Sequence, residues 1–150
     1  MRDLLRDLFP SSAAADFFCT PNFNRDELGL AVASRLLRHF HAMLDRHLFG
    51  KRWAKQQNRT AFMSIPEIGK GGRLHHHLLL RLPSISGKKE QFAKGAPALF
   101  RRVTTSGTLD VIPVPSMAAQ RIIAEYITKR NLLVDFIISD GFHSPHRAVV

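Results

Sequence analysis

The sequence predicts an α+β fold of the ferredoxin-like (split βαβ) type, with a four- or five-stranded antiparallel sheet and helices packed mainly on one face. The apolar patterns occur in the order strand, helix, strand, strand, helix, strand, helix. A glycine-rich connection, Gly69 to Gly72, joins two apolar runs and predicts an antiparallel hairpin. In this topology the first and third strands are central, so the third strand can present a ligand-binding face at the middle of the sheet.

The first strand and the longest helix account for the first third of the chain. Residues 16–23 form a short apolar run that predicts a strand, with Pro21 shortening it or kinking it near its end. From Asn24 or Arg25 to about Leu48, apolar residues recur at three- and four-residue spacing, which predicts a helix. Basic residues and histidines fall largely between these apolar positions, and we expect them in solvent: Arg35, Arg38, His39, His41, Arg46 and His47. The spacing of the three histidines fits no metal-ligand pattern.

The hairpin strands are predicted at residues 61–68 and within residues 72–82, ending before Pro83. Before them lies a polar, basic connection whose Trp53 either covers the end of the core or offers a face for a stacked base. After them, a helix is predicted to start at Lys88 and to be interrupted by Gly95 and Pro97.

The last elements are a strand, a helix and a further strand. Residues 108–114 predict the fourth strand, and Ser116 is a suitable N-cap for an amphipathic helix from Met117 to Arg130. Leu132 to Ser139 predict a fifth strand. The domain therefore divides into an N-terminal extension at 1–15, a core at 16–131 and a C-terminal strand or tail at 132–150.

The composition restricts the class of partner. The 150 residues contain 22 Lys and Arg against 12 Asp and Glu, a formal net charge of +10. Such a basic chain predicts a polyanionic partner, most simply nucleic acid, and the alternative is an inert basic surface. The single cysteine, Cys19, excludes an intrachain disulfide and a multi-cysteine zinc site and fits a reducing cytoplasm. No apolar run has transmembrane length, so no membrane partner is expected.

A metal site is predicted on the second hairpin strand. Successive side chains of a strand point to opposite faces, so His75 and His77 share one face while His76 points to the other with the neighbouring leucines. Glu67, on the preceding strand, is the expected third ligand. A mixed nitrogen and oxygen set of this kind suits Mg²⁺ or Mn²⁺ with open positions for a substrate oxygen.

A second constellation lies on the last helix. Tyr126 is the only tyrosine, and Lys129 follows three residues later, so phenol and ammonium can share one helix face. A phenol is a reasonable nucleophile toward phosphorus but is protonated at pH 7, with an ordinary pKa of about 10. A divalent ion and a lysine are the groups that can assist it.

Together these motifs resemble the HUH endonuclease superfamily, in the order found in rolling-circle replication initiators. The resemblance is carried by Glu67, by His75-His76-His77 and by the Tyr126-to-Lys129 motif, and residues 17–23 are similar to the family's first motif. It spans roughly residues 16–130. The family usually has a bulky apolar residue where this chain has His76, but the alternation of the strand, which turns the leucines to the other face, favours Glu67, His75 and His77 as the metal ligands.

The resemblance implies site-specific nicking and joining of single-stranded DNA at an origin or hairpin. Glu67, His75 and His77 would hold the metal, and Tyr126 would attack the phosphodiester to give a 5′-phosphotyrosine and a free 3′-hydroxyl, with Lys129 assisting. This chemistry would initiate rolling-circle replication of a plasmid, phage or related element. With a single tyrosine, ending a round would need a second protomer or another nucleophile.

Five basic residues are candidates for holding the DNA backbone: Lys70, Arg73, Arg81, Lys88 and Lys89. No Gly-x-x-x-x-Gly-Lys-Ser/Thr motif occurs, so unwinding would come from a host helicase. Two alternatives stay open: a single-tyrosine transposase acting as a dimer, and a non-catalytic module that binds single-stranded nucleic acid.

Overall fold

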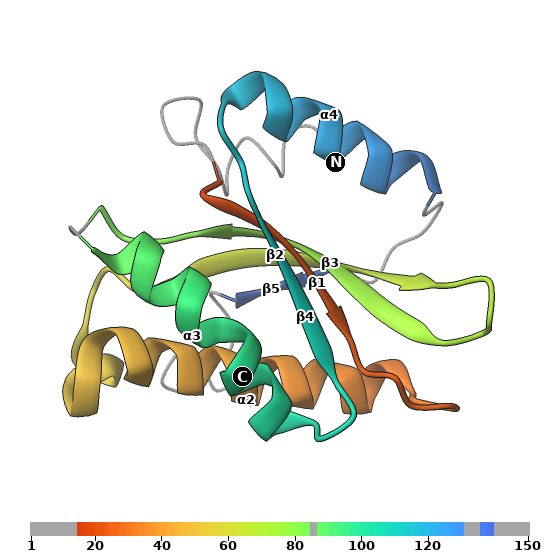
Figure 1. Cartoon of the computed structure of the whole chain (residues 1–150), viewed down its shortest axis with the longest axis horizontal. Coiled ribbons are helices and arrows are strands. Elements are labelled where there is room, and N and C mark those ends of the chain that lie inside the picture. Colours follow the sequence, from red (N-terminus) through yellow and green to blue (C-terminus); the bar gives the residue numbers. More distant parts are fainter. Residues whose placement is uncertain (1–14, 85–86, 131–135, 140–150) are drawn as a thin grey trace, which may run out of the picture.

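One five-stranded antiparallel sheet forms the centre of the computed structural model, which describes residues 15–84, 87–130 and 136–139 (Figure 1). Its strand order is β4-β1-β3-β2-β5. The bounds of the strands are β1 Phe17–Asn22, β2 Ala61–Ile68, β3 Leu74–Arg81, β4 Thr108–Pro113 and β5 Ile137–Ile138. The predicted α+β, ferredoxin-like architecture is confirmed, and β1 and β3 are interior strands as expected.

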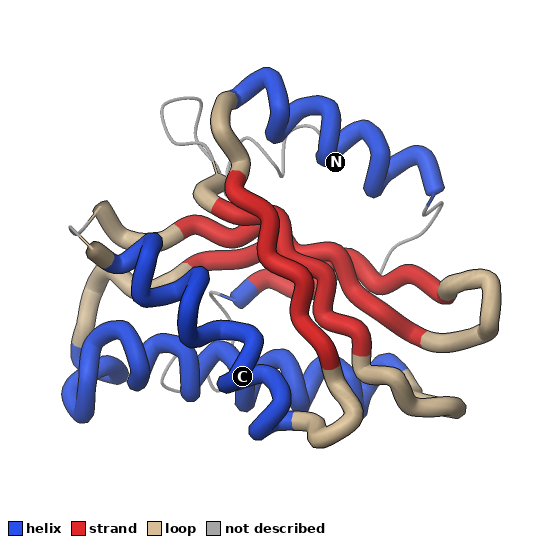
Figure 2. The backbone as a smooth tube through the Cα atoms, in the orientation of Figure 1, coloured by secondary structure: helices blue, strands red, loops and turns tan. Residues whose placement is uncertain are grey.

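The helices cover both faces of this sheet unequally. α2 and α3 pack on one face and α4 on the other (Figure 1 and Figure 2). Their bounds are α2 Leu30–Phe49, the short 3-10 helix η1 Gly50–Lys55, α3 Lys88–Val103 and α4 Met117–Arg130. Among the described residues, no helix combines the length and the apolar character needed to cross a membrane.

The alternation of β3 divides the core into two clusters. Leu74, Leu78 and Leu80 lie in the main cluster with the buried residues of α2 and α3. Leu79 points to the opposite face, in a smaller cluster with Ile127 of α4. The odd-numbered side chains of β3, including His75 and His77, therefore belong to the α4 side of the sheet.

Two helix predictions were wrong in their boundaries. The first helix begins at Leu30 and not at Asn24 or Arg25, because Asn24 and Glu27 adopt positive φ angles of 53° and 59° and Gly29 is the N-cap. The left-handed region lies outside the helical conformation, so the chain turns before the helix starts.

The third helix is continuous through both residues predicted to interrupt it. Pro97 lies inside α3, whose buried face carries Phe92, Ala96 and Phe100 into the core. A Cβ at Gly95 would lie 2.6 Å from Nε2 at the end of the exposed His47 side chain, so glycine leaves room for that imidazole between α3 and α2. Tertiary packing thus outweighs the weak local propensity of the two residues.

The other boundaries agree with the sequence where the structure describes them. Ser116 caps α4 by accepting a hydrogen bond from the Ala119 amide at 3.1 Å, as predicted. The two-residue strand β5 lies within the predicted fifth strand, of which residues 131–135 are outside the described part. Residues 1–14 of the expected extension and the tail from residue 140 onward are also outside it.

Candidate metal centre

The β2–β3 hairpin brings the three predicted metal ligands together. Glu67 is directly opposite His75 in the antiparallel ladder, and Ile65 is opposite His77, so Glu67 and His77 are diagonal neighbours. The connection closes through a hydrogen bond from the Gly69 amide to the Arg73 carbonyl at 3.0 Å, with Gly72 at a φ of 74°. This short turn fixes the register and thereby places the carboxylate beside both imidazoles.

The distances within this triad suit one divalent cation. His77 Nε2 lies 2.6 Å and His75 Nε2 lies 3.6 Å from Oε2 of Glu67. Each residue offers one ligand atom, and these atoms all lie within 4.8 Å of one another. Ligand atoms around an octahedral ion with bonds of about 2.1 Å are about 3.0 Å apart when adjacent and about 4.2 Å apart when opposite. The three ligand atoms therefore lie close enough together to hold one metal ion.

Two side chains of β1 orient His77. The Phe18 ring stacks on the imidazole with centroids 5.5 Å apart, and Thr20 Oγ1 lies 3.5 Å from Nδ1. A hydroxyl can donate to Nδ1 when Nε2 bears the proton, and can accept from Nδ1–H when Nε2 binds a metal. Sequence reasoning missed both residues. The available signal was that Phe18 and Thr20 are two residues apart and so share one face of the first strand, which the predicted topology places next to the histidine strand.

His76 lies on the opposite face of β3, in the main core. Its side chain is fully buried, its Nδ1 is 2.8 Å from the Ser64 hydroxyl, and the Phe23 ring meets it edge-on. Burial, with the neighbouring His75 and His77 contributing, lowers the pKa of His76 to about 4. The predicted separation of the three histidines between two faces is confirmed, and His76 is directed away from Glu67.

Tyr126 lies beside the triad on α4. Its ring centroid is 6.3 Å from that of His77, and its side chain is 47 % exposed. About half of the Tyr126 side chain is thus exposed next to the triad. Lys129 belongs to the same helix, but its side chain lies outside the described part of the chain.

The predicted DNA-binding residues fall into two groups. Lys70 and Arg73 lie at the hairpin turn next to the triad, where Arg73 pairs with Asp26 at 3.0 Å. Arg81 is at the other end of β3, six residues or about 20 Å from His75.

Lys88 and Lys89 begin α3 and do not lie at the triad end of β3. Lys88 donates to the Leu48 carbonyl at the end of α2, and Lys89 forms an ion pair with Asp16 at 2.7 Å. These contacts link α3 to α2 and to the residue before β1. The structure thus places two of the five basic residues near the metal centre.

Comparison with known proteins gives no relative: no family model, curated protein or solved structure matches the chain. The fold and the site define a ferredoxin-like α+β domain with a candidate metal centre on its hairpin.

Proposed function

We propose that the chain is a metal-dependent endonuclease that acts on single-stranded DNA through a tyrosine nucleophile. More particularly, we infer an HUH-type nicking and joining enzyme that initiates rolling-circle replication of a plasmid, phage or related element. The observation that carries this proposal is the position of Tyr126, whose ring lies 6.3 Å from that of His77 in the Glu67–His75–His77 triad.

The residues of the triad would hold the cation, and each contributes differently. Glu67 supplies the negative charge, and the two imidazoles supply neutral nitrogen ligands from the same strand face. A bound divalent ion would supply Lewis-acid polarisation of a phosphodiester oxygen. The side chains of Glu67 and His75 are 14 % and 20 % exposed, so the site is open on one side to a phosphate.

Tyr126 would carry out the bond exchange. Its phenol oxygen forms a bond to phosphorus while the bond from phosphorus to the 3′-oxygen breaks. The phenol loses one proton and the departing 3′-oxygen gains one, so no co-reactant is consumed. Because the phosphodiester is replaced by a phosphotyrosine, a 3′-hydroxyl can reverse the step, and nicking and joining can share one site. Lys129 is proposed to stabilise the charge on the phosphate.

The charge of the chain supports a nucleic-acid substrate. A net charge of +10 favours binding to a polyanion through release of counterions. The chain has no phosphate-binding loop motif of a helicase motor, so a host helicase is the proposed partner for unwinding. We place the reaction in the cytoplasm, where the substrate and such a helicase would be present.

The test is a search for a covalent adduct. The protein is incubated with a labelled pool of single-stranded oligonucleotides in Mn²⁺, and the products are separated on a denaturing gel. We expect a protein-linked band that disappears with a chelator, in Tyr126→Phe and in His77→Ala. His39→Ala, which removes an exposed histidine of α2, is the matched control and should keep the band. Tight metal-independent binding without an adduct for any sequence would instead leave a non-catalytic binding module.

A further inference from the structure

A second polar site lies at the other end of the β2–β3 hairpin. There the structure forms a cavity of about 640 Å³ between the segment before β2, the segment after β3 and the end of β5. Its lining includes the polar side chains of Gln57, Asn58, Arg59, Arg81, Ser84 and Ser139. The metal centre does not use this cavity.

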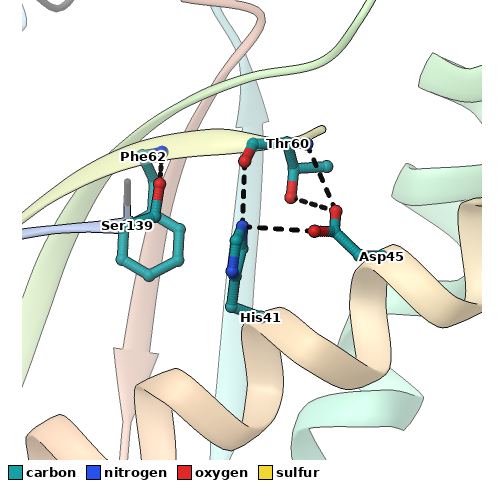
Figure 3. A network of polar contacts seen from close by, with 5 residues as sticks. All are labelled: His41, Asp45, Thr60, Phe62 and Ser139. Carbon is teal, nitrogen blue, oxygen red and sulfur yellow. Dashed lines mark hydrogen bonds and ion pairs between the residues drawn. The ribbon is translucent and has the colours of Figure 1, made fainter. Parts of the chain in front are cut away.

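A buried hydrogen-bond network forms the wall of the cavity on the α2 side (Figure 3). His41 Nε2 contacts the Thr60 carbonyl at 2.9 Å, while the amide and hydroxyl of Thr60 donate to Asp45 Oδ1 at 3.2 and 2.5 Å. His41 is 2 % exposed and Asp45 is fully buried, so the expectation that His41 lies in solvent was wrong. The network fastens the start of β2 to α2 and gives the cavity a fixed wall.

A separate hydrogen bond fixes the β5 edge. The Phe62 amide donates to the Ser139 hydroxyl at 2.8 Å, which holds the end of β5 against β2 (Figure 3). Hydrogen bonds thus fix the walls of the cavity at the start of β2 and at the end of β5. A preformed cavity loses less conformational entropy when it binds a ligand.

The charge of the cavity is positive. Arg59 and Arg81 line it, and no carboxylate of the described residues does. Within the described part of the chain, neither guanidinium forms an ion pair. Arg59 lies over the Trp53 ring, with Cζ 5.9 Å from the ring centroid. Two guanidiniums with nearby amides and hydroxyls are the donors that recognise a phosphate group.

We propose that this cavity is a phosphate-binding site, separate from the metal centre, for a nucleotide phosphate. The phosphate can belong to a single-stranded nucleic acid or to a free nucleotide. Ala61, at the cavity, and Glu67 are six residues apart on β2, or about 20 Å. That length corresponds to about six nucleotides at the rise of about 3.4 Å of a stacked strand, so one strand can reach both sites.

The test compares two double variants that remove the same charge. Arg59→Gln/Arg81→Gln alters the cavity, and Arg101→Gln/Arg102→Gln removes two exposed arginines from the last turn of α3, outside the cavity. Binding of a labelled 16-nucleotide single strand is measured by fluorescence anisotropy over a range of salt. Binding of inorganic phosphate and of ATP is measured by calorimetry. Thermal unfolding of each variant verifies the fold, and the single variants replace a double variant that does not fold.

We expect the cavity variant to bind the strand at least tenfold more weakly than the control variant. The slope of log K against log salt concentration should fall in magnitude by about 1.4, the value for two phosphate contacts on a single strand. That result identifies the nucleic-acid backbone as the source of the phosphate. Loss of phosphate and ATP binding alone would identify a free nucleotide. Equal effects of the two double variants on every ligand would overturn the proposal.

This test is independent of the Tyr126 adduct. A cavity effect without an adduct would support the phosphate site and remove the nicking function. An adduct, together with equal ligand binding by the two double variants, would support the nicking function and overturn the phosphate site.

Discussion

The Ser64–His76 pair offers the sharpest test of how β3 is divided between core and metal site. The two side chains come from neighbouring strands, are both fully buried and meet at 2.8 Å. His76 Nε2 has no hydrogen-bond partner in the described structure, so Ser64 is the hydrogen-bond partner of the imidazole. Ser64→Ala removes that partner and leaves a buried polar ring.

The expected loss of stability follows from this burial. Leaving a buried polar group without a partner costs about 1–3 kcal/mol, whereas replacing both partners by apolar groups is close to neutral. Ser64→Ala should therefore lower the free energy of unfolding by about 1–3 kcal/mol. The double variant Ser64→Ala/His76→Leu should recover most of that loss. The cycle then gives a coupling energy of similar size.

Two quantities are measured on the parent chain, Ser64→Ala, His76→Leu and the double variant. Urea unfolding followed by circular dichroism gives the free energy of unfolding, and calorimetry with Mn²⁺ gives the metal affinity. We expect the Ser64 and His76 variants to keep the Mn²⁺ affinity of the parent chain, because His76 faces away from Glu67. His77→Ala serves as the contrast and should lose Mn²⁺ binding.

Two results would refute this reasoning. If His76→Leu abolished Mn²⁺ binding in a protein of unchanged stability, His76 would be a ligand and the assignment of faces would be wrong. A coupling energy near zero would show that the buried contact does not stabilise the fold.

Two further predictions concern the neighbouring strand β1. Thr20→Val should weaken Mn²⁺ binding about tenfold, because it removes the hydroxyl that lies 3.5 Å from Nδ1 of His77. Calorimetry measures this affinity, and Thr105→Val, at an exposed position, is the control that should not change it. An unchanged Mn²⁺ affinity in both variants would contradict an orienting role for Thr20. Burial raises the pKa of the Cys19 thiol, so a thiol reagent should label the chain only after unfolding in urea, and rapid labelling of the native protein would contradict the position of Cys19 in the core.

Local patterns in the sequence were sufficient to predict the hairpin and the clustering of its three candidate metal ligands. A strand has a side-chain period of two, and a four-residue glycine-rich turn leaves few registers, so Glu67, His75 and His77 were placed on one face from spacing alone. The start of α4 was also predictable from local sequence, because the Ser116 side chain caps the helix.

Features that depend on tertiary contacts were not predictable in this way. His41 was predicted to lie in solvent, yet it and Asp45 are both buried because the start of β2 crosses α2 at Thr60 and supplies their partners. Such partners lie 15 and 19 residues away in the sequence, so no helix pattern reveals them. The roles of Phe18 and Thr20 likewise require the pairing of β1 with β3.

The position of Tyr126 follows from packing rather than from the phenol itself. Ile127, the next residue of α4, is buried against Met63, Ile65 and Leu79 on the face of the sheet that carries His77. Successive residues of a helix are about 100° apart, so burying Ile127 fixes the rotation of the helix and leaves Tyr126 at its edge. Near the start of α4, Gln120 holds the helix in place by accepting the Ala15 amide at 2.6 Å. The smaller core cluster therefore sets the distance between the candidate nucleophile and the candidate metal site, and the two constellations that are far apart in the sequence meet because that cluster is filled.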